Sequence, residues 1–244
     1  MKAVVIGGTA GVGRELANLL AAKGCSLLIV GKDLKDINAC TADLSLRYGV
    51  QVSGAAINAS NITIFVNDLE ISANSFGKIN YLFLPIGASN KEDIGDLKVN
   101  EVIDLLSSNF LASVMASQIF QPLFSKDEKS GVIGFSSVAA IRGRNRNVIY
   151  SASKRALESY FESLKMVTKN SDFSVQVYRL GFVDTYQSHG QDLLFPKMEA
   201  KKVAQAIINN LGKRSKTFYY PRYWYLLAHV ILHLPLQVYR KLSS

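Results

Sequence analysis

The N-terminus places an apolar strand pattern directly before a glycine-rich turn and a helical pattern, and this order restricts the fold more than any other feature. Residues 3–6 are apolar and mostly β-branched, and residues 13–23 place leucines on one helical face. Glycines at positions 7, 11 and 13 fit a turn that is tight, lets backbone approach a pyrophosphate, and packs the helix closely on the strand. We therefore expect a dinucleotide whose phosphates lie at the helix N-terminus. The residues expected to contact it are Gly7, Thr9, Ala10, Gly11, Val12 and Gly13.

Short apolar runs alternate with helical patterns along the rest of the chain. Strands separated by helices pair in parallel through crossovers, and continuously apolar strands belong to a sheet covered on both faces. The pattern predicts a doubly wound α/β fold of the Rossmann type, with three layers and a mostly parallel sheet. Strands are expected at 3–6, 26–30, 50–57, 81–86, 131–135 and 174–179, and helices at 13–23, 34–48, 64–73, 99–123, 150–168 and 203–211.

Composition narrows the function classes. The net charge of +9 suits solubility and anionic ligands such as a phosphorylated cofactor, and the sequence has no basic stripe that would indicate nucleic-acid binding. Three scattered histidines and two cysteines give no metal or disulfide pattern, which favours reduced thiols and a cytoplasmic protein. The N-terminal pattern lacks a signal-peptide core, and no run of 18 apolar residues predicts a transmembrane helix.

The end of the second expected strand bears on the choice of cofactor. An acid at this tip favours a free ribose 2′-hydroxyl, whereas a base nearby favours a 2′-phosphate. Position 31 at this tip is glycine rather than an acid, and Lys32 supplies a cation. Asp33 could still reach the ribose from two positions after Gly31. NADP(H) is therefore favoured over NAD(H). The alternative is that Lys32 and Asp33 only form the solvated first turn of the next helix.

A phenol and an ammonium group stand one helical turn apart near the start of a helix. Tyr150 and Lys154 lie on one face of that helix, so the cation can lower a phenol pKa that is ordinarily about 10. Ser136 and Ser137 follow a strand, where one hydroxyl could polarise a substrate carbonyl and the other could cap the loop. Asn109 sits inside the long helix 99–123, where an amide is mildly unfavourable and an exposed position is the alternative.

Together these motifs resemble the short-chain dehydrogenase/reductase family over residues 1 to about 211. The resemblance implies a seven-stranded sheet and hydride transfer between a nicotinamide cofactor and a substrate carbonyl. It implies that Tyr150 is the acid/base, that Ser137 orients the carbonyl, and that Lys154 binds the nicotinamide ribose and lowers the tyrosine pKa. Asn109 would hold a water that links Lys154 to solvent.

The resemblance also assigns further positions to the cofactor. Asn58 would lie beside the adenine, and residues 180–185 match the segment that covers the nicotinamide carboxamide. The cofactor residues added in this way are Asn58, Gly87, Gly181, Val183 and Thr185, besides Tyr150 and Lys154. The family pattern is absent at Ile6, Leu84 and Leu180. We expect an apolar contact between Ile6 and Leu84 to replace the family's polar tie between these neighbouring strands.

The last part of the chain differs in composition from the rest. Residues 1–216 are expected to form the catalytic Rossmann domain, and residues 217–244 form a tail rich in aromatic and apolar side chains. The run 224–234 is too short to span a bilayer. Tyrosine and tryptophan beside an apolar stretch and basic residues suit a membrane interface, whereas a pocket lid or a subunit contact is the alternative.

The sequence thus predicts an NAD(P)(H)-dependent oxidoreductase that reversibly reduces a ketone to an alcohol, with Tyr150 as general acid/base. A membrane-surface reductase of a lipid or lipid-linked keto-sugar is the first alternative, and a catalytically silent dinucleotide-binding sensor or scaffold is the second. The intact Ser137, Tyr150 and Lys154 argue against the silent scaffold. We also expect a small-molecule substrate and a homodimer or homotetramer. The expected location is the cytoplasm, and a peripheral membrane contact through the tail is the alternative.

Overall fold

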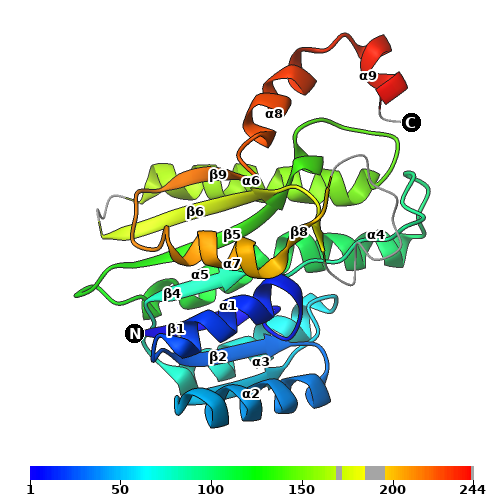
Figure 1. Ribbon diagram of the computed structural model, residues 1–244. Helices are drawn as coiled ribbons and strands as arrows, with labels where there is room; N and C mark the ends of the chain where they lie inside the picture. Colours follow the sequence, from blue (N-terminus) through cyan, green and yellow to red (C-terminus); the bar gives the residue numbers. More distant parts are fainter. Residues whose placement is uncertain (169–171, 185–195, 243–244) are drawn as a thin grey trace.

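The computed structural model describes residues 1–168, 172–184 and 196–242 (Figure 1). Its centre is a seven-stranded sheet in the order β3-β2-β1-β4-β5-β6-β9, and every pairing within this sheet is parallel. The prediction of a doubly wound, parallel sheet is confirmed. The strands are β1 (Lys2–Ile6), β2 (Ser26–Gly31), β3 (Val52–Ala56), β4 (Tyr81–Leu84), β5 (Ser130–Ser137), β6 (Phe173–Leu180) and β9 (Lys216–Tyr220).

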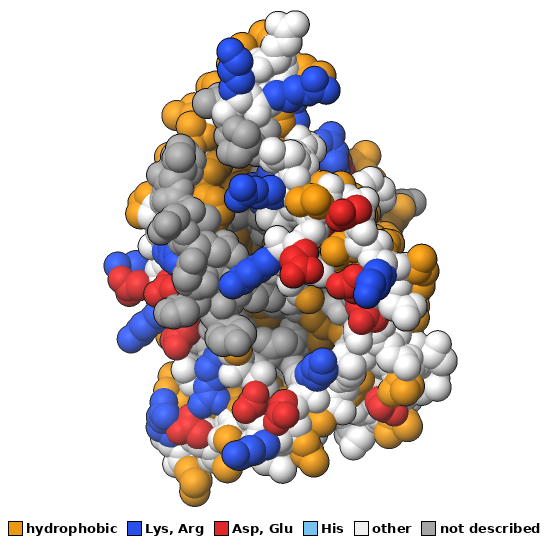
Figure 2. Space-filling model, turned by 90° about the vertical axis from the view of Figure 1, so that its right-hand side faces the viewer, with side chains coloured by type: hydrophobic (Ala, Val, Ile, Leu, Met, Phe, Trp, Pro, Cys, Tyr) orange, Lys and Arg blue, Asp and Glu red, His pale blue; other side chains and the backbone are white. Residues whose placement is uncertain are grey.

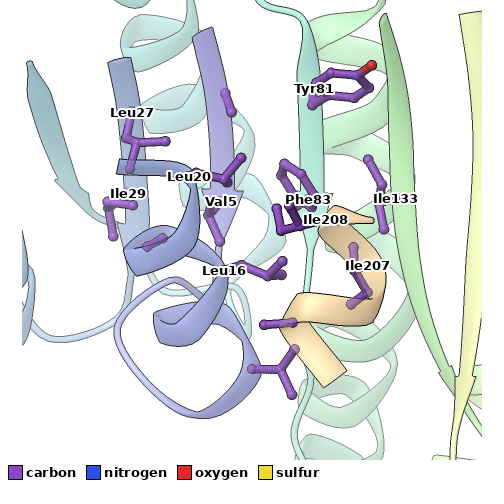
Figure 3. Close-up of a cluster of buried hydrophobic side chains, with 14 of the residues drawn as sticks. Val5, Leu16, Leu20, Leu27, Ile29, Tyr81, Phe83, Ile133, Ile207 and Ile208 are labelled. Atoms are coloured by element: carbon purple, nitrogen blue, oxygen red, sulfur yellow. The ribbon is translucent and has the colours of Figure 1, made fainter. Parts of the chain in front are cut away.

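Helices cover both faces of the sheet, because successive residues of each buried strand point to opposite sides and both sides are apolar. On one face lie α1 (Gly11–Ala22), α2 (Leu34–Tyr48) and α7 (Ala200–Ile208). On the other lie α3 (Ile62–Phe76), α5 (Ala112–Phe120) and α6 (Val148–Val167). Figure 3 shows Leu16 and Leu20 of α1 and Ile207 of α7 within the first cluster, beside Val5 and Phe83 of the sheet. Truncating such a buried leucine to alanine costs about 2–5 kcal/mol.

The expected boundary after residue 216 falls at the first residue of β9, so residues 217–220 lie in the sheet. β9 pairs with β6, and the ring of Phe218 stacks on that of Tyr178 with centroids 4.9 Å apart. The run from Lys216 to Tyr220 contains Thr, Phe and two Tyr residues, which are good strand formers. This strand signal was masked by the aromatic composition of the residues that follow.

The long helix expected over 99–123 forms as a continuous but irregular helix. It consists of α4 (Val99–Leu106), a π-helical turn over Ser107–Leu111, α5, and a 3₁₀ turn over Gln121–Leu123. By length and composition alone Val99–Leu123 could cross a membrane, but half of its most apolar window is buried inside the fold. The apolar residues of its α5 part belong to the core that α5 forms with the sheet.

Two helices end the chain, α8 (Trp224–His233) and α9 (Leu236–Leu242), and they extend away from the sheet after β9 (Figure 1). Trp224 and Ala228 are buried and fasten α8 to the domain. Arg142, from a distant loop, donates hydrogen bonds to the carbonyl oxygens of Ile231 (2.8 Å) and Leu234 (2.6 Å). These contacts satisfy carbonyl groups that the end of a helix leaves without partners.

The neighbouring strands β1 and β4 place Ile6 and Leu84 as expected. The register pairs Val5 with Phe83, so Ile6 and Leu84 are the next residues on the two strands. Both are buried in the same hydrophobic cluster. This arrangement agrees with an apolar tie between the two strands.

Candidate active site

The predicted site residues gather at the carboxyl edge of the sheet. Figure 2 shows this face of the molecule, which is hollowed near its middle and has several Lys and Arg side chains beside the hollow. Ligands bind at this edge in open α/β sheets. Over the described ranges, no group of three or more His, Cys, Asp or Glu side chains could hold a metal ion.

The glycine turn between β1 and α1 is tightly packed. Gly7 has a φ of +93° and Gly11 a φ of +52°, conformations that favour glycine. A Cβ at Gly13 would lie only 1.9 Å from the carbonyl oxygen of Gly7, so no other residue fits without a backbone shift. α1 has no side-chain cap at Ala10 and no acidic residue in its first turn. Its positive end is therefore suited to an anion.

The tips of β2 and β3 lie side by side, as the Ile57 amide donates to the Gly31 carbonyl oxygen at 2.6 Å. Lys32 is exposed. The Asp33 carboxylate caps α2 by accepting from the amides of Lys35 (2.8 Å) and Asp36 (3.1 Å). The amide oxygen of Asn58 accepts from the Ser60 backbone at 3.1 Å. Asp33 is thus engaged with its own helix, whereas the Lys32 ammonium can reach a ligand at this tip.

Two serines end β5, and they have different surroundings. Ser136 is buried and its hydroxyl donates to the Lys154 carbonyl oxygen at 3.5 Å, so it joins the strand to α6. The Ser137 hydroxyl accepts from the Ala139 amide at 3.1 Å and forms a hydrogen bond with the Tyr150 side chain. Of the two serines considered from the sequence, Ser137 therefore faces the tyrosine.

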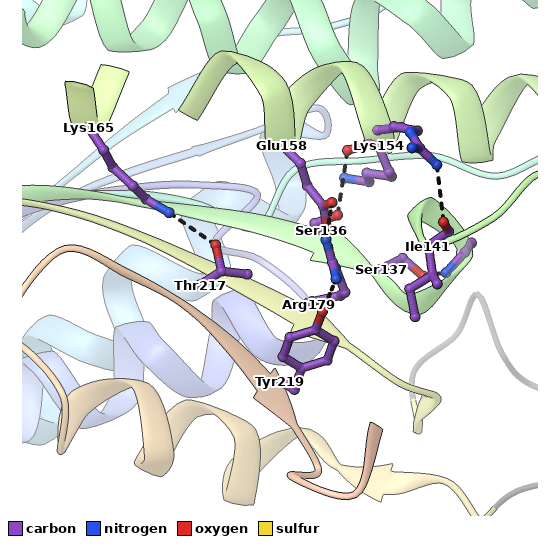
Figure 4. A network of polar contacts seen from close by, with 11 residues as sticks. Ser136, Ser137, Ile141, Lys154, Glu158, Lys165, Arg179, Thr217 and Tyr219 are labelled. Atoms are coloured by element: carbon purple, nitrogen blue, oxygen red, sulfur yellow. Dashed lines mark hydrogen bonds and ion pairs between the residues drawn. The ribbon is translucent and has the colours of Figure 1, made fainter. Parts of the chain in front are cut away.

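Lys154 is deeply buried, with 4% of its surface exposed, on the first turns of α6. Its ammonium nitrogen donates to the carbonyl oxygens of Phe135 (3.1 Å) and Ile86 (3.3 Å) and lies 5.9 Å from the centre of the Tyr150 ring. Figure 4 shows Lys154 above Ser136 and Ser137, with Glu158 one turn further along α6. The lysine is therefore held by backbone carbonyls of two strand ends beside the phenol.

Asn109 is fully buried, so the exposed position considered from the sequence is wrong. It lies in the π-helical turn, and such turns are frequent at functional sites. Its amide group bonds both backbone groups of Ala88, donating at 2.8 Å and accepting at 3.0 Å. A Cβ at Gly87 would lie 2.7 Å from the Asn109 oxygen and 3.0 Å from the Lys154 ammonium. Gly87 thus lets the backbone pass between these two side chains.

Burial shifts the pKa values of the two central groups in opposite directions. Burial raises the pKa of the Tyr150 phenol, while the Ser137 hydrogen bond and the positive charge of Arg144 act to lower it. The lowering expected from Lys154 is not among these effects, so Arg144 is the cation that acts on this pKa in the structure. Burial lowers the pKa of Lys154 to about 8, and the negative charge of Glu158 partly offsets this effect. The site thus contains a neutral phenol and an ammonium group that releases its proton unusually easily.

The lowered pKa of Lys154 predicts a pH-dependent stability. Between pH 8 and pH 10 the unfolded chain still protonates this lysine, with its usual pKa of 10.5, whereas the folded protein does not. The unfolded state then binds more protons, so folding becomes more favourable as pH rises. We expect the free energy of unfolding of the cofactor-free protein to rise by about 2 kcal/mol across this window relative to Lys154→Met. Urea unfolding of both proteins at several pH values measures the difference, and parallel pH profiles would contradict it.

Three residues that sequence reasoning did not identify complete this region. The buried Asp93 carboxylate accepts from the amides of Ile149 (3.1 Å) and Tyr150 (3.0 Å), and so caps the helix that holds the tyrosine. Arg144 lies within electrostatic reach of Tyr150. Trp224 from the tail occupies the space beside Gly181, where a Cβ would lie 2.2 Å from the indole nitrogen. None belongs to a local motif: Asp93 and Trp224 act on residues far away in the sequence, and Arg144 is a single loop residue six positions before Tyr150.

The segment expected over the nicotinamide is partly described. The Gly181 amide donates to the Tyr220 carbonyl oxygen at 2.9 Å, and Val183 pairs with Met198 in the short strands β7 (Val183–Asp184) and β8 (Met198–Glu199). Thr185 lies outside the described residues. Gly181 is therefore adjacent to β9 and to the start of α8.

Comparisons with known proteins agree with this arrangement. Residues 1–192 match the family model for short chain dehydrogenases. An uncharacterized oxidoreductase from Staphylococcus epidermidis is 27% identical over 214 residues, which cover 87% of this chain and 91% of that protein. A short chain dehydrogenase/reductase from Burkholderia phymatum, solved with NAD, aligns with a TM-score of 0.82 at 19% identity, covering 93% of this chain and 91% of that one. A short chain dehydrogenase from Burkholderia cenocepacia J2315, solved with NADP, aligns with a TM-score of 0.79 at 21% identity, covering 89% and 94%.

Proposed function

Because this chain belongs to the short chain dehydrogenase/reductase family, whose members are NAD(P)-dependent oxidoreductases, we propose that it reversibly reduces a ketone to an alcohol with Tyr150 as general acid/base. The observation that supports this proposal is the convergence of Asn109, Ser137, Tyr150 and Lys154 at one edge of the sheet. These groups come from three separate elements, α6, β5 and the π-helical turn. Core packing does not explain this convergence, because apolar residues would fill the same positions better.

In the proposed reaction each side chain has a distinct task. The Tyr150 hydroxyl donates its proton to the substrate oxygen during reduction and regains one during oxidation. Ser137 donates a hydrogen bond to the same oxygen and orients it. The positive charge of Lys154 stabilises the phenolate that forms, which lowers the cost of proton transfer. Asn109 keeps Ala88 and Gly87 in place beside the ammonium group.

The residues present fit a nicotinamide dinucleotide. Glycine at positions 7 and 13 lets the turn pack closely against its neighbours, because a Cβ at either position would crowd protein backbone. The uncapped start of α1 at this turn suits the pyrophosphate. When bound, the nicotinamide supplies or accepts the hydride at the substrate carbon. The proposed binding residues, besides Tyr150 and Lys154, are Gly7, Thr9, Ala10, Gly11, Val12, Gly13, Lys32, Asp33, Asn58, Gly87, Gly181, Val183 and Thr185.

NADP(H) is the proposed form of the cofactor, because Lys32 is exposed at the β2 tip while the Asp33 carboxylate is occupied as a helix cap. We expect Lys32→Ala to weaken NADPH binding about tenfold more than NADH binding, since only NADPH has the 2′-phosphate that forms a charge-assisted bond. Fluorescence titration of both cofactors measures the ratio. Lys35→Ala, which removes another exposed cation near this tip, is the matched control. Equal weakening of both cofactors would show that Lys32 does not discriminate between them.

A second candidate function is a reductase that acts at a membrane surface on a lipid or lipid-linked keto-sugar. It is supported by the exposed apolar side chains of α8 and α9, which lie beside the basic residues Arg240 and Lys241. The exposed apolar residues are Tyr223, which precedes α8, and Tyr225, Leu226, Val230, Leu232, Leu236 and Val238 of the two helices. Apolar area beside positive charge suits the interface of an anionic bilayer.

Vesicle binding tests this candidate without removing the buried Trp224. We expect the full chain to co-sediment with anionic vesicles at low salt, and the triple variant Leu226→Ser, Val230→Ser, Leu236→Ser to stay in solution. The control variant Ile64→Ser, Ile71→Ser removes exposed apolar residues from α3 instead and should still co-sediment. If the full chain stays in solution at low salt, where surface attraction is strongest, the membrane candidate fails.

If the membrane candidate fails, we propose instead that the tail covers a pocket or a subunit contact. For the assembly we propose a homodimer or homotetramer in the cytoplasm, with Ile103 of α4 and Met166 of α6 as exposed apolar residues that such an interface could bury. Analytical ultracentrifugation distinguishes these states from a monomer.

A further inference from the structure

Three arginines lie in five residues between Ser137 and Tyr150, and their surroundings differ. Arg142 binds the tail. It donates to two carbonyl oxygens at the end of α8 and lies 4.5 Å from the centre of the Tyr239 ring. Arg146 is exposed to solvent. Arg144, between them, is half-buried.

Among the residues that the structure describes, the half-buried guanidinium of Arg144 has no counter-charge. Its Nε atom is buried and has no hydrogen-bond partner among the described residues, and the salt bridges there involve other side chains. Burial lowers its pKa, and the groups that act in the opposite direction are the phenols of Tyr239 and Tyr150. Among the described residues, the groups that act on the charge of Arg144 are therefore two phenols and no carboxylate.

An unpaired, partly desolvated cation is unfavourable. Buried charges in folded proteins are normally paired, and an unpaired one loses solvation without a compensating hydrogen bond. The guanidinium is planar, remains charged at neutral pH, and presents parallel donors that match two oxygens of a carboxylate or phosphate. Its charge acts on Tyr150, so this cation lies within electrostatic reach of the reacting hydroxyl.

We propose that Arg144 binds an oxyanion of the substrate, so that this enzyme acts on ketones that also contain a carboxylate or a phosphate ester. This inference rests on the proposed carbonyl reduction at Tyr150. The tail packs on the neighbouring part of this loop, where the Tyr239 hydroxyl donates to the Arg142 carbonyl oxygen at 3.3 Å. The rest of the substrate would then lie between Arg144 and Tyr150.

The test uses straight-chain keto acids with one to six methylene groups between ketone and carboxylate, each paired with its methyl ester. Binding to the NADPH complex is followed by the fluorescence of bound NADPH, and turnover is followed separately by NADPH oxidation. We expect at least one keto acid to bind about tenfold or more tightly than its ester, since a charge-assisted hydrogen bond is worth about that factor. A keto phosphate ester and its dephosphorylated alcohol form the second arm, which identifies the preferred oxyanion.

Variants assign the preference to one side chain. Arg144→Met should remove the difference between acid and ester without changing NADPH affinity, Arg144→Lys should retain part of it, and the exposed control Arg146→Met should leave it intact. Wild-type protein that binds every acid and ester equally would overturn the inference, as would an acid preference that survives Arg144→Met. Binding preference without any NADPH oxidation would instead contradict the proposed reduction and leave the oxyanion site standing.

Discussion

Replacing Tyr150 by phenylalanine is expected to lower turnover by at least about 100-fold, the size of effect typical of losing general acid/base help. The change removes the hydroxyl and keeps the ring, so the packing around it is preserved. Cofactor affinity should stay within about twofold, because the loss of one hydroxyl leaves the glycine turn and Lys154 unchanged. Steady-state kinetics with saturating substrate and a fluorescence titration of NADPH measure the two quantities.

The matched control for this change lies on the same helix. Tyr160 is also partly buried on α6, and its ring packs edge-on against Phe161 at 5.3 Å, away from the carboxyl edge of the sheet. Tyr160→Phe should leave turnover nearly unchanged. If both variants retain turnover, Tyr150 is not the acid/base, and if both lose it equally, the effect belongs to α6 as a whole.

Replacing Gly13 by alanine is expected to abolish measurable cofactor binding and to destabilise the fold by at least about 2 kcal/mol. The added methyl would lie 1.9 Å from the Gly7 carbonyl oxygen and 3.1 Å from the Pro85 side chain. Relieving this overlap requires α1 or the Gly7 peptide to shift, and either shift displaces backbone groups that we expect to meet the phosphates. Denaturant unfolding and NADPH titration measure the two effects.

Gly143 provides the control for this substitution. A Cβ there meets nothing within 4 Å, and the residue is exposed in the loop after β5. Gly143→Ala should therefore bind NADPH and unfold as the parent protein does. Normal cofactor affinity in Gly13→Ala would show that the turn adapts and that its tight packing is not needed for binding.

The fold was predictable because its signals are local and periodic. Apolar runs such as Tyr81–Leu84 are bounded by turn residues, and the glycine turn marks the first crossover. The seventh strand, Lys216–Tyr220, escaped prediction because its aromatic residues continue without a break into the aromatic residues of the tail. The irregular turn at Ser107–Leu111 escaped prediction because five residues are too few to alter the apolar periodicity of the surrounding helix.

The site divides in the same way. Tyr150 and Lys154 are neighbours on one helix, so their spacing alone indicates that they act together. Asp93, Arg144 and Trp224 acquire their roles only when a distant loop or the tail folds against them, and single residues in such loops have no periodicity to detect. Asp33 and Lys32 are an intermediate case. From the sequence, each could belong to the first turn of a helix or contact the cofactor. The hydrogen bonds of Asp33 show that its carboxylate caps the helix.

The central claim is that this chain catalyses carbonyl reduction rather than only binding a dinucleotide, and isotope transfer tests it most directly. The protein is incubated with NADPH deuterated at the nicotinamide C4 and a panel of ketones that includes the keto acids, and the alcohols are analysed by mass spectrometry. We predict that at least one alcohol contains one deuterium at its carbinol carbon, and that Tyr150→Phe yields it at least about 100-fold more slowly. Tight NADPH binding with no labelled alcohol from any ketone would contradict the claim and identify the protein as a silent dinucleotide-binding scaffold.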